Sequence, residues 1–232
     1  MKYLVVRNYR LDTFNKIGGQ QLVYTVFDIE TSGLERDSDI YEFAYIRLDD
    51  EFNIIKSDVL YFYRSKWNVT AGNIHGLTKD VLEPHAKDFF KNLAAMYSTL
   101  QNTIAVGKNN MLFDNIVISN FINRYKFDVD KQKGIRDFTI KASIDVQNYM
   151  APYYRKYMSE NAMPTNGHSK GTLEDYMKVC GFTKDILENF AIANNIEVNE
   201  RFKAHGAMYD TLMTFATLKW LAYSARVTFN PK

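Results

Sequence analysis

Two acidic residues separated by a single residue give this sequence its clearest indication of chemistry. Asp28 and Glu30 lie in the segment VFDIETSGL, residues 26–34, whose apolar residues are typical of a buried strand. Side chains two apart on a strand project from the same face, about 6.7 Å apart along it. Two such carboxylates repel each other unless one is protonated or a cation binds between them. Hard oxygen ligands suit Mg²⁺ or Mn²⁺, although an exposed strand edge with two solvated acids would show the same pattern.

Three further residues have both an ordinary structural explanation and a chemical one. Asp114 follows Phe113 in GKNNMLFD, at the start of a predicted helix, where the helix dipole favours an acid. His205 and Asp210 are five positions apart, and five residues of a helix rotate by about 500°, so the two would not share a helix face. Both can reach one site only if His205 precedes the helix, which Gly206 permits. A histidine on such a loop suits a general base; otherwise the pair is a surface histidine and an ordinary helix acid.

The composition describes a globular protein with a weak overall charge. The chain has 232 residues, enough for one large or two small domains, and its four prolines and eleven glycines favour compact structure over long linkers. A net charge of +2 is too small for a long footprint on duplex DNA. It is compatible with binding a short strand end, where metal ions would neutralise the phosphates.

Cysteine use and hydropathy bear on the cellular compartment. Cys180 is the only cysteine, so an internal disulfide is impossible, which fits a reducing compartment. No apolar run approaches the roughly 20 residues that span a bilayer, and the apolar stretch at the start is too short for a signal peptide. A cytoplasmic location without membrane association is therefore the default expectation.

The periodicity of apolar residues predicts a mixed α/β sheet of about five strands flanked by helices. A turn at 49–51 predicts that the second and third strands form an antiparallel meander with the first. We predict strands over 22–28, 40–48, 54–63, 104–106 and 139–144. We predict helices over 78–82, 86–100, 115–125, 145–158, 172–180, 184–194 and 206–226. Residues 1–21 form an N-terminal extension of unclear role, with a possible edge strand over 2–11, and residues 22–232 form a single domain.

Several segments resemble motifs of the DEDDh 3′–5′ exonucleases, the relatives of the proofreading epsilon subunit of bacterial DNA polymerase III, exonuclease X and RNase T. They are the block around Asp28 and Glu30, the GKNNMLFD setting of Asp114, the His-x₄-Asp pair, and NIHGLT at 73–78, with weaker matches at 144–146 and 170–173. Each motif alone is weak, but their order over residues 22–224 is specific. The family often has Gly-His-Asn in the second motif, whereas Lys108 or Asn109 stands here in place of that histidine. Because the acid is retained, this departure bears on substrate preference more than on activity.

The resemblance implies an RNase H-like fold and a two-metal site for hydrolysis of a phosphodiester. In the family pattern, Asp28, Glu30, Asp114 and Asp210 would hold two Mg²⁺ or Mn²⁺ ions, and His205 would take a proton from the attacking water. The bond cleaved would be the last one before a 3′ end, which releases a nucleoside 5′-monophosphate.

The resemblance also implies contacts to the terminal nucleotide. They are the backbone near Thr31 and the side chains of Leu34, His75 and Phe113. Single-stranded or frayed DNA is favoured slightly over RNA, and protein partners are not indicated. Two alternatives remain: a 3′–5′ exoribonuclease of the same family, and a catalytically inactive subunit that binds nucleic-acid ends. The intact set of four acids argues against the inactive subunit, because clustered acids are unfavourable without a metal.

Overall fold

The computed structural model describes residues 22–64, 67–133, 138–140, 142–161, 170–203 and 205–228. The N-terminal extension, with its expected edge strand, lies outside these residues. None of the described helices is long and apolar enough to cross a membrane.

Three antiparallel strands form the first half of the sheet, as the sequence predicted. β1 (Tyr24–Thr31) pairs with β2 (Ile40–Leu48), which pairs with β3 (Ile54–Tyr61). β1 continues three residues beyond the predicted end at 28, so both acids of the first motif belong to the strand. At the turn between β2 and β3, the Asp49 carboxylate accepts hydrogen bonds from the backbone N–H groups of Glu51 and Asn53, at 2.9 and 2.8 Å. A short acidic turn thereby holds the hairpin.

Two parallel strands complete a five-stranded sheet of order β3-β2-β1-β4-β5. β4 (Ile104–Gly107) pairs with β1, and β5 (Ser143–Asp145) pairs with β4. The predicted strand over 139–144 was wrong in its start, since residues 138–140 are not strand. The Asn123 side chain there bonds both the N–H and the C=O of Phe138, at 2.9 Å each, and so replaces strand pairing at that residue.

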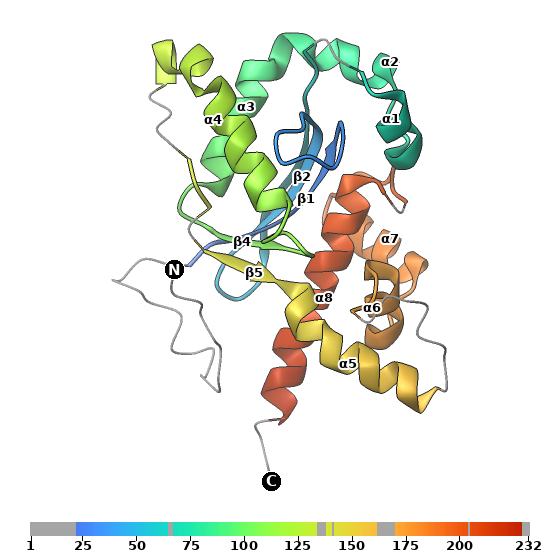
Figure 1. The fold of residues 1–232 in the computed structure, drawn as a ribbon. Helices are drawn as coiled ribbons and strands as arrows, with labels where there is room; N and C mark the ends of the chain where they lie inside the picture. Colours follow the sequence, from blue (N-terminus) through green and yellow to red (C-terminus); the bar gives the residue numbers. More distant parts are fainter. Residues whose placement is uncertain are drawn as a thin grey trace.

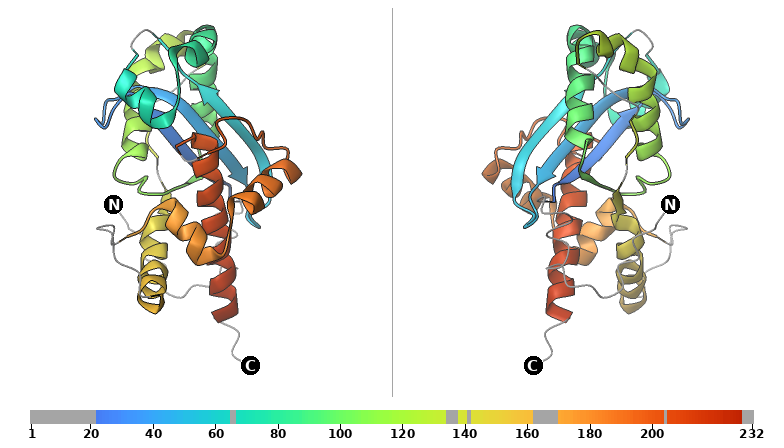
Figure 2. Two further views of the ribbon diagram at one scale, coloured as in Figure 1. Left: turned by 90° about the vertical axis from the view of Figure 1, so that its right-hand side faces the viewer. Right: turned by 90° about the vertical axis from the view of Figure 1, so that its left-hand side faces the viewer.

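The helices cover the two faces of the sheet and enclose two separate cores (Figure 1). Alternate residues of β1 belong to different cores: Val26 packs on one side, Phe27 and Ile29 on the other. α3 (Phe89–Leu100) and α4 (Asp114–Lys133) cover the Phe27 side. α8 (Ala207–Thr228) crosses the Val26 side and packs against β1 and β2 (Figure 2). Three further helices pack around α8 and complete that layer: α5 (Val146–Glu160), α6 (Leu173–Cys180) and α7 (Lys184–Ala193).

The helix ends show where local sequence signals were sufficient. Thr172 and Asp175 form the expected capping box of α6, and Gly181 ends that helix in the left-handed conformation with φ 74°. The predicted helix over 86–100 is a 3₁₀ helix, η2 (Glu83–Asp88), followed by α3, because Pro84 occupies its first turn. Ahead of it, α2 (Lys79–Leu82) begins after the N-cap Thr78.

One helix was missed in the sequence. α1 (Val69–His75) is capped by Asn68, whose side chain accepts from the N–H groups of Thr70 and Ala71. Its larger apolar residues do not form a buried stripe, since Val69 is 63% exposed and Ile74 65% exposed. Hydrophobic periodicity, the main signal used for the other helices, is therefore absent here.

Candidate active site

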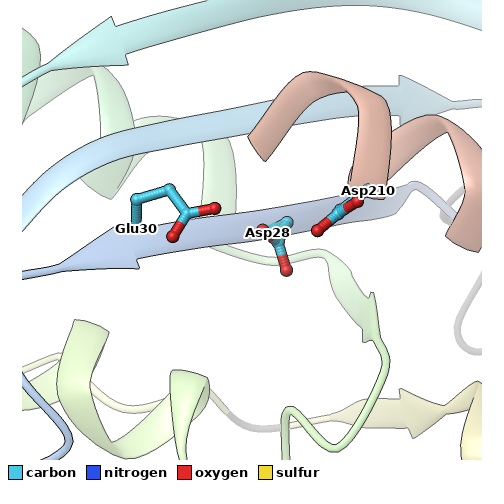
Figure 3. Close-up of side chains that lie close together, drawn as sticks. All are labelled: Asp28, Glu30 and Asp210. Carbon is cyan, nitrogen blue, oxygen red and sulfur yellow. The ribbon is translucent and has the colours of Figure 1, made fainter. Parts of the chain in front are cut away.

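Three of the four predicted acids meet on the α8 side of the sheet. Asp28 and Glu30 project from β1 on the same face as Val26, and Asp210 faces them from the first turn of α8 (Figure 3). One oxygen from each carboxylate can be chosen so that all three lie within 4.8 Å of one another. This separation lets a single cation contact all three residues.

Asp210 reaches the site because α8 begins directly behind a tight loop. The Asp210 N–H donates to the Gly206 carbonyl at 3.1 Å in the first turn of the helix. Its Oδ1 atom is buried and has no hydrogen-bond partner among the described residues. A buried carboxylate oxygen that accepts no hydrogen bond needs an explanation. The neighbouring acids support the explanation that this oxygen is a metal ligand.

Asp114, the fourth predicted acid, lies at the edge of this group. It is the first residue of α4 and is not among the three whose oxygens approach within 4.8 Å. It is near enough for its charge to contribute to raising the pKa of Asp28 and of Glu30, after burial and closer acids. The structure therefore gathers three predicted acids and places the fourth beside them.

Burial and mutual repulsion raise the proton affinity of the whole group. Burial, followed by the charges of Asp210 and Glu30, raises the pKa of Asp28 well above its ordinary value. Burial also raises the pKa of Glu30 to about 9, and the pKa values of Asp114 and Asp210 to about 7. Near neutral pH, the protein alone therefore requires protons or a cation at this site. The donor set, composed of hard carboxylate oxygens, fits Mg²⁺ or Mn²⁺.

Polar side chains of β5 hold the loop between β4 and α4. The Asp145 carboxylate accepts from the N–H of Asn109 at 2.8 Å and from that of Gln147 at 3.0 Å. The side-chain amides of Asn110 and Asn115 both donate to Ser143 Oγ at 3.0 Å. Sequence reasoning missed this support and placed Asp145 as the first residue of the predicted helix over 145–158, whereas it is the N-cap of α5.

Lys108 brings a positive charge to the carboxylates at the position where the chain departs from the family pattern. β1 and β4 pair in parallel with Val26 opposite Val106, both in the α8-side core. Asp28 follows Val26 by two residues, and Lys108 follows Val106 by two residues. Burial raises the pKa values of Asp114 and Asp210, and the charge of Lys108 offsets part of that rise. Lys108 forms no ion pair within 4.0 Å with any residue that the structure describes.

His205 stands before α8, as the five-residue spacing to Asp210 required. It is exposed, adopts the left-handed conformation with φ 62°, and precedes α8, which starts at Ala207. Gly206 is needed for close approach, since a Cβ atom there would lie 2.0 Å from the Arg201 carbonyl oxygen. The histidine is thus displayed on a tightly folded loop at the entrance to the helix.

The expected substrate contacts differ in accessibility. Leu34 is 88% exposed after the turn that ends β1. Thr31 Oγ1 donates to the Gly33 carbonyl at 2.6 Å, which folds that turn. Phe113 packs against the core beneath α3 and α4 and is half-buried. His75 is only 4% exposed.

His75 is held as a neutral imidazole. Burial, followed by the charge of Arg201, lowers its pKa to about 4. Its Nδ1 accepts from the Leu77 N–H at 3.2 Å, which fixes the proton on Nε2. A hydrogen bond with the Thr31 backbone offsets part of the lowering of its pKa.

A five-stranded mixed sheet with carboxylates on its first strand and on its last helix defines an RNase H-like nuclease architecture. The RNase T exonuclease family matches this chain over residues 25–181, more than half of its length. The chain therefore belongs to the DEDDh-type 3′–5′ exonuclease family, as the motif order indicated.

Solved structures confirm the fold. Escherichia coli exonuclease I in complex with a dA16 oligonucleotide is 24% identical with a TM-score of 0.61, over 88% of this chain and 41% of that one. The same enzyme with a dT13 oligonucleotide is 24% identical with a TM-score of 0.58, over 90% of this chain and 43% of that one. Cell-death related nuclease 4 is 12% identical with a TM-score of 0.50, over 87% of this chain and 64% of that one. The chain thus spans about two fifths of exonuclease I. No curated protein sequence matches it significantly.

Proposed function

We propose that this protein is a metal-dependent 3′–5′ exonuclease that removes nucleoside 5′-monophosphates from single-stranded or frayed DNA. The observation that carries the proposal is the convergence of Asp28, Glu30 and Asp210, with one oxygen of each within 4.8 Å of the others. Family membership makes a phosphodiester the bond to be cleaved. The unusually high proton affinity of the cluster supports a role in binding divalent cations.

The four acids and His205 divide the chemistry between them. Asp28, Glu30, Asp114 and Asp210 would hold two divalent cations, which would supply Lewis-acid stabilisation of the negative charge on the phosphodiester. His205 would accept a proton from the attacking water on an imidazole nitrogen, since its exposure permits exchange with solvent. The water oxygen forms a bond to phosphorus, and the bond from phosphorus to the 3′ oxygen of the preceding nucleotide breaks.

The turn after β1 and the loop after β4 would bind the terminal nucleotide. Leu34 offers an exposed apolar surface on which a base can stack, and Phe113 and the Thr31 backbone lie on the two segments that flank the acids. Stacking of this kind contributes about 1–3 kcal/mol per base and tolerates any sequence. His75 would support this pocket by holding the end of α1.

The oligonucleotides bound to exonuclease I support DNA as the polymer. Those structures contain single-stranded dA16 and dT13, and this chain shares their fold over most of its length. Preference between DNA and RNA depends on contacts to the 2′-hydroxyl. The experiment that tests the proposal therefore includes RNA as well as DNA, so that it also tests the exoribonuclease alternative.

The test is degradation of 5′-labelled single-stranded DNA and RNA of one sequence, with Mg²⁺, Mn²⁺ or EDTA. We expect a metal-dependent ladder that shortens from the 3′ end, faster on DNA. Asp28→Asn should be inactive. Glu160→Gln, which removes an exposed acid at the end of α5, is the matched control and should be active. Faster loss of RNA would establish the exoribonuclease, and binding without cleavage of either polymer would establish the inactive end-binding subunit.

A further inference from the structure

We propose that Arg201 is the positioning residue that fixes the His205 loop against the carboxylate site, with Glu42 as its buried anchor. The proposal rests on the exonuclease function above and adds a residue outside the predicted set of acids and histidine. It depends on three groups of contacts, which join parts of the chain that are far apart in sequence.

The first group joins the loop to the sheet. The Arg201 guanidinium forms a two-pronged ion pair with Glu42 on β2, through Nη2 to Oε2 and through Nε to Oε1 at 3.4 Å. The side chains are 16% and 2% exposed, respectively, so the pair is buried. Glu42 is the register partner of Glu30 on β1. The loop is therefore attached to the sheet directly beside a proposed metal ligand.

The second group leads from Arg201 to His205. The Arg201 carbonyl accepts from the Lys203 N–H at 2.8 Å, and the Lys203 carbonyl accepts from the Gly206 N–H at 2.9 Å. The backbone of Gly206 also packs against the Arg201 carbonyl so closely that no side chain fits there. Two successive tight turns thus connect Arg201 to Lys203 and Lys203 to Gly206, the residue that directly follows His205.

The third contact reaches the predicted substrate side. Arg201 Nη1 donates to the His75 carbonyl at 3.1 Å, at the last residue of α1. One guanidinium therefore joins β2, the loop before α8 and the end of α1. Arginine can do this because its planar group presents several donors in a fixed arrangement, which lysine lacks.

Other packing holds the loop mainly on the side of α8. Phe202 packs against Tyr209 of α8, with ring centroids 5.0 Å apart. A cavity of about 290 Å³ lies between the segment and β3, lined by Val59 and Tyr61 on the strand and by Ile196 and Phe202 on the loop. The Tyr61 side chain nevertheless forms hydrogen bonds with both Glu42 and Arg201. The Arg201–Glu42 pair therefore links the loop to the sheet on β2 and also contacts β3.

The test compares Arg201→Met with Arg201→Met/Glu42→Met. The single variant leaves a buried carboxylate unpaired, whereas the double variant replaces the pair with apolar groups and should regain thermal stability. If Arg201 positions His205, both should lose about 10²-fold in kcat on a single-stranded oligonucleotide, with KM changed by less than about threefold. Recovery of kcat in the double variant would overturn the proposal, because Arg201 would then serve only to neutralise Glu42.

Two further variants complete the design. Arg201→Lys keeps the charge and folds without an unpaired acid, but loses the two-pronged contact, so we expect a partial loss of kcat. Arg155→Met removes an exposed arginine of α5 and should leave kcat unchanged. Wild-type kcat in Arg201→Lys together with wild-type kcat in the double variant would exclude a positioning role.

A second measurement is independent of catalysis. Amide hydrogen exchange over residues 202–209 should be faster in the double variant than in the wild type, without metal or nucleic acid. Unchanged exchange would overturn the proposal even for an active enzyme. If the wild type cleaves neither DNA nor RNA, the proposed function fails, while faster exchange would still establish Arg201 as the anchor of the loop.

Discussion

Glu30 and Glu42 are register partners on adjacent strands, yet only Glu42 forms an ion pair with Arg201 among the described residues. Glu42 thus has a positive partner within the protein. Glu30 instead lies within reach of Asp28 and Asp210, and burial, followed by the charge of Glu42, raises its pKa to about 9. Two acids that face each other therefore have different roles: one anchors a loop, and the other is left to bind a cation from solution.

The first prediction concerns Asp28→Asn in the absence of metal. At pH 9 the wild-type cluster is forced towards ionisation, and removal of one charge relieves repulsion within it. Relief of about 1 kcal/mol would raise Tm by about 2–4 °C in a protein of this size. Thermal unfolding in EDTA measures this change in Tm, with Glu160→Gln as the control. Asp28→Asn should also lose its exonuclease activity. A lower Tm for Asp28→Asn would contradict mutual repulsion as the source of the raised pKa.

The second prediction is the pH dependence of stability. Burial raises the pKa of Glu30 to about 9 and those of Asp114 and Asp210 to about 7, so the folded state binds more protons than the unfolded state above about pH 4. The contribution of these groups to stability is therefore largest at low pH and is lost as pH rises towards 9.

Metal binding should reverse that trend, because cations replace the protons. Measured from pH 5 to 9, the difference in Tm between Mn²⁺ and EDTA should widen as pH rises. In Asp28→Asn it should widen less. A difference that is constant with pH would argue against metal binding by these carboxylates.

The third prediction concerns His205→Asn. Asparagine tolerates the left-handed backbone that His205 adopts with φ 62°, so the loop should keep its shape. Loss of a general base should lower kcat about 10²–10⁴-fold. Because His205 is exposed, Tm should stay the same. A kcat near that of the wild type would assign the proton transfer to another group.

The sequence predicted those parts of the fold and site that local patterns encode. Alternation and capping located most strands and helices, and the spacing of His205 and Asp210 required the histidine to precede a helix. α1 was missed because its larger apolar residues are exposed, and the predicted start of β5 was too early, since residues 138–140 are not strand. No pattern in the sequence indicated the Arg201–Glu42 pair that anchors the His205 loop.

The Arg201–Glu42 pair joins residues 159 positions apart. No periodicity or motif connects an arginine in an irregular segment to one particular glutamate elsewhere in the chain. Such a contact arises only when the sheet and the segment before α8 are folded together. Its discovery therefore required the tertiary structure.

The last prediction concerns His75, which we expect to act without changing its charge. Burial, followed by the charge of Arg201, lowers its pKa to about 4, so it remains neutral throughout the range in which the enzyme would work. His75→Gln would disturb the bond that the Leu77 N–H donates to Nδ1 at 3.2 Å, at a cost of about 1–3 kcal/mol in unfolding free energy. Urea unfolding measures that loss. The shape of the pH–rate profile should be the same as in the wild type, because no titration of His75 contributes to it. A shifted limb in this variant would mean that His75 changes protonation during turnover, and the neutral, supporting role would be wrong.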